Sequence, residues 1–299
     1  MLQFAELDER ALRSLSRERP PSTWTTMTEL ADEAERSITA LRARREELAR
    51  GLWERVCCWL DGHVRTTERE SLDEPAHPEE AKVRQVRFLH WQNLALLSYR
   101  RYRGALAPAI AAAAQRRQGA PVRVLELACG SGDMAIGLAD EARGGPAVQI
   151  TGSDVEPAYI AQANARARAL GSTASFRVID AFALDAAVVG EVDVVFLAQS
   201  AHHFSPGSIA RIIAQAGRAG ATHLVIIDGR RSARTLVALP LIASASLDRH
   251  FTRDAWISAR RLYAETELTL LARIAAPRAR VSVRTLFPLT TVLEVAFAT

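Results

Sequence analysis

The strongest local signal for chemistry in this chain runs from Glu126 to Asp133 and reads Glu-Leu-Ala-Cys-Gly-Ser-Gly-Asp. Its first two residues end a short apolar run, Val122–Leu127, that is typical of a buried strand. Two glycines one residue apart predict a tight turn in which the backbone approaches a ligand closely, because glycine has no Cβ to collide with it. Glu126 precedes that turn, where its carboxylate could meet a positively charged group.

Two further carboxylates end later apolar runs. Asp154 closes the run Val148–Asp154, about twenty residues after the glycines, and Asp180 closes Phe176–Asp180. A carboxylate at the end of a second strand can accept hydrogen bonds from the hydroxyls of a ribose. The spacing therefore predicts a nucleoside-containing ligand at one edge of a sheet.

A pair of histidines follows a fourth apolar run, Val192–Leu197, in the sequence Gln199-Ser-Ala-His-His-Phe204. Imidazole titrates near neutral pH and can act as a general base. His202 and His203 are therefore the candidates for moving a proton.

These residues belong to a region in which strands and helices alternate from Pro121 onward. A fifth strand is expected at His223–Asp228, and this alternation predicts a mostly parallel sheet with helices on both faces. Near the end, after a helix at Glu265–Ala275, the β-like runs Ala279–Leu286 and Thr291–Ala298 are separated by four residues. Such a short gap cannot hold a crossover helix, so these two strands must pair antiparallel.

The first part of the chain has a helical pattern. Residues before about 25 are expected to form a loose arm, and the spacing of Thr26 and Glu29 predicts a capping box. An apolar stripe from Leu30 to Trp59 then predicts one long helix, the charged stretch Thr66–Glu80 a linker, and residues 81–117 a second long helix. We therefore expect a helical region over residues 1–118, acting as a lid or a dimerisation face of a homodimer, and a ligand-binding domain over 119–299.

Composition limits the possible partners. The net charge is +4 and the pI about 9.3, but basic residues alternate with acidic ones, so a nucleic-acid surface is not expected. The three cysteines show no Cys-x-x-Cys spacing, which favours neither a zinc site nor a disulfide framework. The N-terminus lacks the pattern of a signal peptide, and the longest apolar stretch, Leu236–Leu247, is too short to span a bilayer. A cytoplasmic protein that does not enter a membrane is expected.

The glycine turn alone fits two cofactors. Gly130, Gly132 and Ala135, together with Asp154, also satisfy the dinucleotide pattern GxGxx(G/A), which would indicate an NAD(P)-dependent oxidoreductase. Glu126 argues against that alternative, since binding of a pyrophosphate gains nothing from a negative charge in front of the turn. The C-terminal hairpin, with no second catalytic domain expected after it, argues the same way.

Taken in order, these motifs make residues 121–299 resemble the class I S-adenosylmethionine-dependent methyltransferases. Val124–Gly132 resembles the first motif of that family, with Ala128 in place of the usual first glycine, which predicts a negative φ at Ala128. The resemblance implies a Rossmann-like, seven-stranded α/β sheet with an antiparallel C-terminal hairpin. It also implies S-adenosylmethionine as the cofactor.

The resemblance assigns roles to the residues of these motifs. Glu126 and the loop backbone are expected to hold the methionine part of the cofactor, Asp154 its ribose, and Asp180 its adenine amine. The implied cofactor-binding set is Glu126, Ala128, Gly130, Gly132, Asp154, Asp180, Ala181 and Gln199.

The sequence indicates only the chemical class of the methyl acceptor. His202 and His203 are expected to handle its proton, Trp91 and Tyr99 to close over an aromatic group, Arg230 to bind an acidic group, and Tyr263 to line the pocket. No motif for base methylation follows the fourth strand, so a hydroxyl of a small secondary metabolite is the expected acceptor. A binding protein of the same fold without catalytic activity is the remaining alternative.

Overall fold

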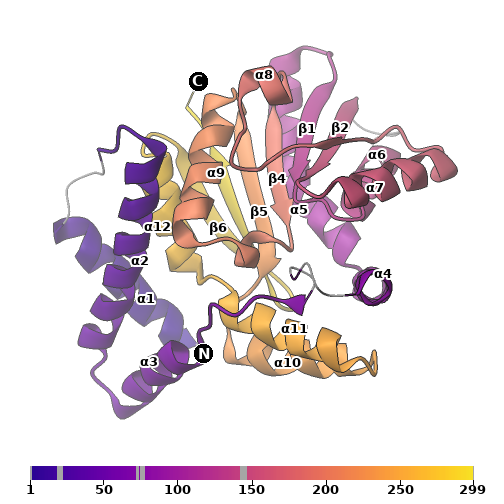
Figure 1. The fold of residues 1–299 in the computed structure, drawn as a ribbon. Helices are drawn as coiled ribbons and strands as arrows, with labels where there is room; N and C mark the ends of the chain where they lie inside the picture. The colour runs from indigo at the N-terminus through magenta and orange to yellow at the C-terminus, as the bar shows by residue number, and fades with distance from the viewer. Residues whose placement is uncertain (1, 19–22, 72–73, 75–77, 142–146, 299) are drawn as a thin grey trace. The chain divides into compact units, whose positions relative to one another are not determined.

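The strands of this protein form one mixed sheet in the order β3-β2-β1-β4-β5-β7-β6 (Figure 1). The computed structural model describes residues 2–18, 23–71, 74, 78–141 and 147–298. The bounds of the seven strands are β1 Val122–Leu127, β2 Val148–Asp154, β3 Ser175–Val178, β4 Val194–Ala198, β5 His223–Gly229, β6 Arg280–Leu286 and β7 Thr290–Ala296.

Strand direction follows the prediction. β1 pairs in parallel with both β2 and β4, and the pairs β2–β3 and β4–β5 are parallel as well. β6 and β7 pair antiparallel from Arg280 opposite Ala296 to Leu286 opposite Thr290. The predicted seven-stranded fold and its antiparallel C-terminal hairpin are therefore confirmed.

By packing, the chain divides into two compact units whose segments interleave in sequence. The sheet unit comprises Pro78–Ala201, Ile212–Asp228 and Arg278–Thr299, and the helical unit comprises Met1–His77, His202–Arg211 and Gly229–Pro277. The helices at 79–117 pack with the sheet rather than with the N-terminal helices. The division expected after residue 118, between a lid or dimerisation region and a ligand-binding domain, stays a prediction.

The helices of the sheet unit are α4 Glu79–Ala95, α5 Ser98–Arg117, α6 Asp133–Glu141, α7 Pro157–Leu170 and α8 Ala186–Val189, with α9 Pro206–Arg218 shared between the two units. Of these, α5 packs against β1 and β4, α6 against β2, and α7 against β2 and β3. Buried side chains of α5, such as Tyr102, Leu106 and Ile110, share one core cluster with Val124 and Phe196 of the strands. Burial of these apolar groups holds the strand ends, and hence the residues that follow them, in fixed positions.

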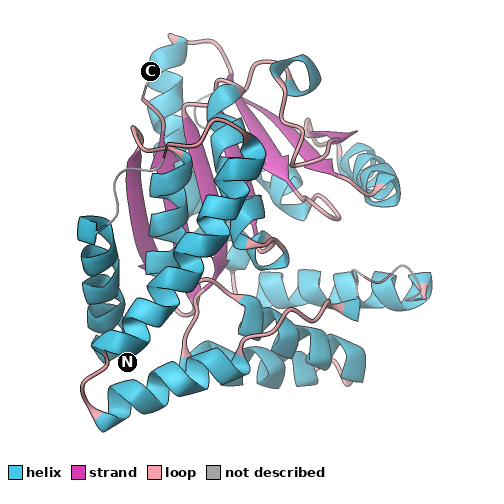
Figure 2. Ribbon diagram, turned by 60° about the vertical axis from the view of Figure 1, so that its left-hand side comes forward, coloured by secondary structure: helices cyan, strands magenta, loops and turns pink. Residues whose placement is uncertain are grey.

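The helical unit contains α1 Leu2–Glu18, α2 Met27–Leu48, α3 Leu52–Val64, α10 Ala233–Ser244, α11 Arg249–Arg261 and α12 Glu265–Ala275. α2 packs against both α1 and α12, and α10 packs against α11. Helices are drawn in cyan in Figure 2, where the two long N-terminal helices α1 and α2 lie side by side.

The predicted capping box at the start of α2 is confirmed. Thr26 Oγ1 accepts a hydrogen bond from the Glu29 backbone N–H at 3.1 Å, and Glu29 Oε2 accepts one from the Thr26 N–H at 3.2 Å. These bonds satisfy backbone donors that the first turn of a helix leaves without partners.

Three predictions about the N-terminal region are wrong. The expected loose arm is helix α1, in which Leu7, Leu12 and Leu15 are buried. The prediction failed because these apolar residues are widely spaced among charged ones in the sequence. The first long helix ends at Leu48 and restarts at Leu52. The second is interrupted because Leu97 has a φ of +52°, a single left-handed residue that helical periodicity cannot reveal.

Within the described ranges, none of the helices combines the length and apolar character needed to cross a membrane.

Candidate functional site

The glycine loop, residues 128–132, has left-handed backbone at three alternate positions. φ is +50° at Ala128, +50° at Gly130 and +75° at Gly132. The negative φ predicted at Ala128 is therefore wrong: the alanine keeps the left-handed conformation that favours glycine, at a cost of about 1–2 kcal/mol. The next residue shows how the turn is held, since the Cys129 N–H donates to the Ser153 carbonyl at 2.9 Å.

Close packing beneath the loop explains two glycines. A Cβ on Gly132 would lie 2.4 Å from Cε1 of Phe176, and one on Gly152 would lie 2.5 Å from the same ring. Since both distances are far inside van der Waals contact, neither position accepts a larger residue without displacing Phe176. At Gly130, by contrast, the space for a Cβ is open.

Glu126 is a buried carboxylate that lacks a full set of partners. It is 3% exposed, and its Oε2 has no hydrogen-bond partner among the described residues. Burial raises the pKa of this carboxyl well above its ordinary value, and the neighbouring Asp133 and Asp154 raise the pKa further. A cation placed at Oε2 would relieve both the desolvation and the repulsion.

Asp154 and Asp180 lie at the same edge of the sheet as Glu126. Asp154 ends β2 and is in register with Val178 of β3, two residues before Asp180, and the Ile179 N–H donates to the Asp154 carbonyl at 3.1 Å. Glu126 lies one strand further along, on β1, in register with Gly152 of β2. The three carboxylates expected to grip one ligand thus stand at the carboxyl ends of three adjacent strands.

Backbone amides orient these carboxylates. Asp154 Oδ2 accepts from the Gly130 N–H at 2.9 Å and Oδ1 from the Glu156 N–H at 3.0 Å. Asp180 Oδ1 accepts from the Phe182 N–H at 2.8 Å, across the turn that contains Ala181. Each carboxylate oxygen can accept a second bond, so ligand hydroxyls and amines can still be bound.

These residues fit S-adenosylmethionine. The partnerless Glu126 Oε2 calls for a cation, which an α-ammonium group supplies, while Asp154 and Asp180 offer acceptors in the order in which ribose and adenine would follow. A pyrophosphate would instead place negative charge beside an already buried carboxylate.

Gln199 follows β4 and is held by a partner that the sequence analysis missed. Its φ is +58°, and its side-chain amide exchanges two hydrogen bonds with Asn93 of α4. Asn93 and His90 are three residues apart on α4, a spacing that places both on one helix face. This spacing is the sequence signal from which Asn93 and His90 could have been predicted as site residues.

A cavity of about 280 Å³ lies beside the glycine loop. Its lining residues come from α4, the glycine loop, the first residue of α6, and α7: Lys82, Val83, Val86, Arg87, His90, Trp91, Ser131, Asp133, Tyr159, Gln162 and Arg166. Trp91 is 66% exposed there. Asp133 pairs with Arg166 at 2.5 Å and with His90 Nδ1 at 3.0 Å. The cavity thus combines apolar surface with basic groups.

Tyr99 contacts this cluster from α5. Its hydroxyl lies 3.2 Å from His90 Nδ1, and burial together with the nearby Asp133 raises the pKa of that hydroxyl. The predicted roles of Trp91 and Tyr99 in acceptor binding stay predictions.

In the helical unit, His202 and His203 both lie close to the buried carboxylate of Glu70. His202 Nε2 lies 3.4 Å from Oε1 of Glu70, and His203 Nε2 lies 3.8 Å from Oε2. Burial raises the pKa of the Glu70 carboxyl, but His202 and His203 outweigh that effect, so the pKa lies below its ordinary value. His202 and Glu70 are both buried, and His203 is partly exposed.

Glu70 lies in the stretch expected to be a linker, of which residues 72–73 and 75–77 are outside the described residues. Both Glu70 and its neighbour Ser71 are buried, at 5% and 2% exposure. Its role could not be read from a local pattern, because its partners lie more than 130 positions away in sequence.

Two residues expected near the acceptor have partners within the helical unit. Arg230 Nε donates to Glu265 Oε1 at 2.8 Å. The Tyr263 hydroxyl donates to the Phe204 carbonyl at 2.6 Å, and burial raises its pKa. Their contact with an acceptor stays a prediction.

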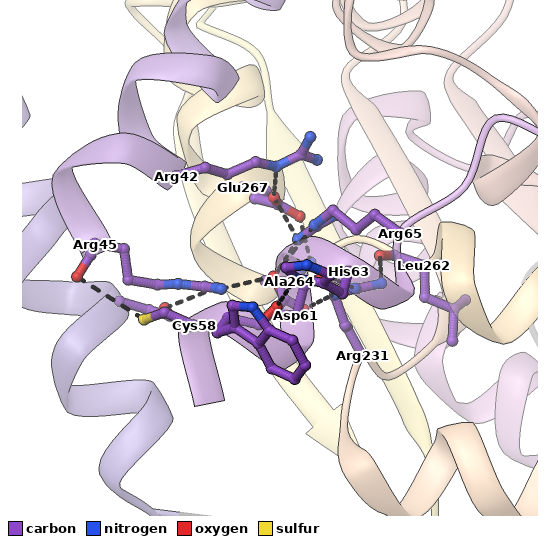
Figure 3. Close-up of polar contacts among 12 residues, drawn as sticks. Arg42, Arg45, Cys58, Asp61, His63, Arg65, Arg231, Leu262, Ala264 and Glu267 are labelled. Atoms are coloured by element: carbon purple, nitrogen blue, oxygen red, sulfur yellow. Dashed lines mark hydrogen bonds and ion pairs between the residues drawn. The ribbon is translucent and has the colours of Figure 1, made fainter. Parts of the chain in front are cut away.

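A second polar cluster of this unit is an ion-pair network (Figure 3). Asp61 accepts from Arg45 and Arg231, at 2.6 Å each, and Glu267 accepts from Arg42 at 2.7 Å and Arg65 at 2.8 Å. Four guanidinium groups share these two carboxylates, and the network ties α2, α3 and α12 together.

Comparison with known proteins agrees with the geometry of the sheet unit. Residues 124–221 match the methyltransferase domain family. A demethylmenaquinone methyltransferase of Thermus thermophilus is 35% identical over 104 residues, which are 33% of this chain and 46% of the relative. The match thus spans less than half of that relative.

Solved structures are similar at lower identity. A SAM-dependent methyltransferase from Aquifex aeolicus has 17% identity and a TM-score of 0.44, over 59% of this chain and 82% of its own. The plantazolicin methyltransferase BamL, solved with SAH, has 14% identity and a TM-score of 0.49, over 73% and 97%. At these scores neither structure indicates an acceptor.

The family match covers the glycine loop together with Glu126, Asp154, Asp180 and Gln199, and it favours methyl transfer over the dehydrogenase alternative. Residues 124–221 therefore form a methyltransferase domain of the class I, S-adenosylmethionine-dependent type.

Proposed function

We propose that this protein transfers the methyl group of S-adenosylmethionine to a hydroxyl of a small secondary metabolite in the cytoplasm. The observation that carries the proposal is the buried, partnerless Oε2 of Glu126 beside the glycine loop, with Asp154 and Asp180 at the next two strand ends. When bound, this cofactor supplies a methyl carbon already activated by a sulfonium. The protein's task is then to bind, align and handle a proton.

Glu126 binds the α-ammonium group in this proposal, Asp154 the ribose and Asp180 the adenine amine, with the Ala181 amide beside it. The backbone at Ala128, Gly130 and Gly132 approaches the methionine part, and Gln199 closes the site at the end of β4. The proton of the acceptor is handled at the His202–His203 pair.

A small-molecule acceptor is supported by two observations. The cavity beside the glycine loop combines the exposed ring of Trp91 with the cations of Lys82 and Arg166, which suits an aromatic acceptor carrying an acidic group. The Thermus relative is named for demethylmenaquinone, itself a small molecule. Tyr99, Arg230 and Tyr263 complete the proposed acceptor-binding set.

Titration calorimetry with S-adenosylmethionine and S-adenosylhomocysteine tests the cofactor part. Both should bind, and Asp154→Ala should weaken binding by about 1–3 kcal/mol because ribose hydroxyls lose their acceptor. Asp185→Ala is the matched control: Asp185 also accepts a backbone N–H, from Ala187 at 2.9 Å, but is exposed before α8. Absence of binding by either compound would overturn the proposal.

Turnover needs its own experiment. With a radiolabelled methyl group on the cofactor, a panel of phenols and aliphatic alcohols should yield at least one labelled ether. Cofactor binding without any labelled product across the panel would instead support the alternative of a non-catalytic binding protein.

A further inference from the structure

The cluster of Glu70, His202 and His203 brings together three side chains that commonly bind metals. One donor atom from each lies within 4.8 Å of the others. Both imidazoles direct Nε2 toward the same carboxylate, and their ring centroids are 4.4 Å apart. Two imidazoles and one carboxylate, with further positions open, form a recurring ligand set for divalent transition metals.

The separations suit a shared cation better than hydrogen bonds. Nitrogen–oxygen hydrogen bonds centre on about 2.9–3.0 Å, whereas Nε2 lies 3.4 Å from Oε1 for His202 and 3.8 Å from Oε2 for His203. Ligand atoms about 2.1 Å from a tetrahedral zinc ion lie roughly 3.4 Å from one another. The first distance fits that value, and the second needs only a small rotation of the partly exposed His203 ring.

Surrounding groups hold these ligands in place. Ser258 donates its hydroxyl to Glu70 Oε1 at 2.6 Å, and Arg261 donates to the His203 carbonyl at 2.8 Å. Partners of this kind orient metal ligands and fix their basicity.

We propose that Glu70, His202 and His203 bind one divalent transition-metal ion, with Zn²⁺ as the first ion to test. Glu70 and His202 provide the buried side of the site, and the 26% exposed side chain of His203 provides the side open to solvent. The open position holds a water molecule or another oxygen ligand.

One functional consequence rests on the proposed function. With both Nε2 atoms on the cation, proton handling passes from the imidazoles to an oxygen ligand, whose pKa the cation lowers so that its proton leaves to solvent. Binding of the cation itself does not depend on methyl transfer.

The test uses the full chain, treated with a chelator and dialysed. Zn²⁺ is titrated in competition with a chromophoric chelator, and Co²⁺ binding is followed by its visible absorption. Wild type should bind one equivalent. Glu70→Gln and His203→Asn should each weaken binding at least tenfold, and Ser258→Ala about tenfold through loss of support for the carboxylate. His63→Asn, an exposed histidine outside the cluster, should bind as wild type does.

The site would be overturned if wild type showed no saturable binding, or if wild type and both ligand variants bound equally. Glu70 would then be a buried carboxylate that is only ion-paired with the two imidazoles. Circular dichroism verifies folding, and Ser258→Ala gives an independent answer if Glu70→Gln does not fold. S-adenosylhomocysteine affinity measured with and without chelator separates the two proposals, because cofactor binding should survive metal removal.

Discussion

Asn93 and Gln199 exchange both of their side-chain amide hydrogen bonds. Asn93 Nδ2 donates to Gln199 Oε1 at 2.8 Å, and Gln199 Nε2 donates to Asn93 Oδ1 at 3.0 Å. Asn93 is 4% exposed, and Gln199 directly follows β4 with a left-handed backbone. The pair therefore fixes α4 to the carboxyl end of a central strand, where we propose that the cofactor binds.

Replacement of Asn93 by Ala should lower the free energy of unfolding by about 1–3 kcal/mol, because the Gln199 amide loses both partners. Urea unfolding followed by fluorescence measures this loss. A double-mutant cycle with Gln199→Ala should show clear coupling, since the double variant leaves no amide unpaired. Strictly additive effects would contradict the pairing.

Glu126 predicts that cofactor binding releases a proton. Burial raises the pKa of its carboxyl, so the free protein keeps a proton there to higher pH than an exposed glutamate does, and the cofactor's ammonium group favours the ionised form. Affinity for S-adenosylhomocysteine should therefore rise with pH through the raised pKa. Calorimetry in buffers of different ionisation enthalpy counts the protons released.

Glu126→Gln should bind the cofactor more weakly and release no proton from this position. The variant should also unfold less readily at neutral pH. The folded-state pKa of Glu126 lies above its unfolded value of 4.5, so the stability that its protonated form contributes is full below pH 4.5 and is lost as pH rises through the folded pKa. If the variant released as many protons on cofactor binding as wild type does, the proton release would come from a group other than Glu126.

The sheet and its cofactor edge could be predicted because their signals are local. Val122–Leu127 followed by Gly130 and Gly132 indicates a strand and a tight turn within a dozen residues. Parallel pairing then places Asp154 and Asp180 at the same edge as Glu126, without knowledge of any side-chain contact.

The errors concern features that depend on single backbone angles or on distant residues. Ala128 adopts a positive φ because the amides of Cys129 and Gly130 are held by the end of β2. Leu97 interrupts a helix with an ordinary apolar side chain. Glu70, in a charged stretch that resembles a solvated linker, is buried by contacts with residues distant in sequence.

A homodimer through the N-terminal helices is the proposed assembly, and α3 is where we expect the contact. Its Leu52, Trp53 and Trp59 are 81%, 61% and 58% exposed, an unusual apolar surface for one helix. The double replacement Trp53→Ser and Trp59→Ser should convert a dimer into a monomer in light scattering coupled to gel filtration. Trp91→Ser, an exposed tryptophan on α4, is the matched control and should leave the mass unchanged. A monomeric wild type would exclude this assembly.

The ion-pair network should dominate the acid stability of the helical unit. Burial raises the pKa of Glu267, but Arg65 and Arg42 outweigh it and lower the pKa to about 2. The unfolded value is 4.5, so the stability contributed by ionised Glu267 is present above pH 4.5 and is lost as pH falls toward 2. This shift corresponds to about 3 kcal/mol.

Glu267→Gln should therefore lower the free energy of unfolding by about 3 kcal/mol at pH 7 and flatten the loss of stability between pH 4.5 and 2, as measured by urea unfolding across that range. The pH dependence due to Asp8 has the opposite sign, because burial raises the pKa of its carboxyl to about 6. The stability contributed by protonated Asp8 is lost as pH rises from 3.8 to 6. The two pH windows overlap little. Glu265→Gln, on the same helix, removes only the more exposed pair with Arg230 and should cost less than about 1 kcal/mol. Equal costs for the two variants would show that burial adds nothing to the network.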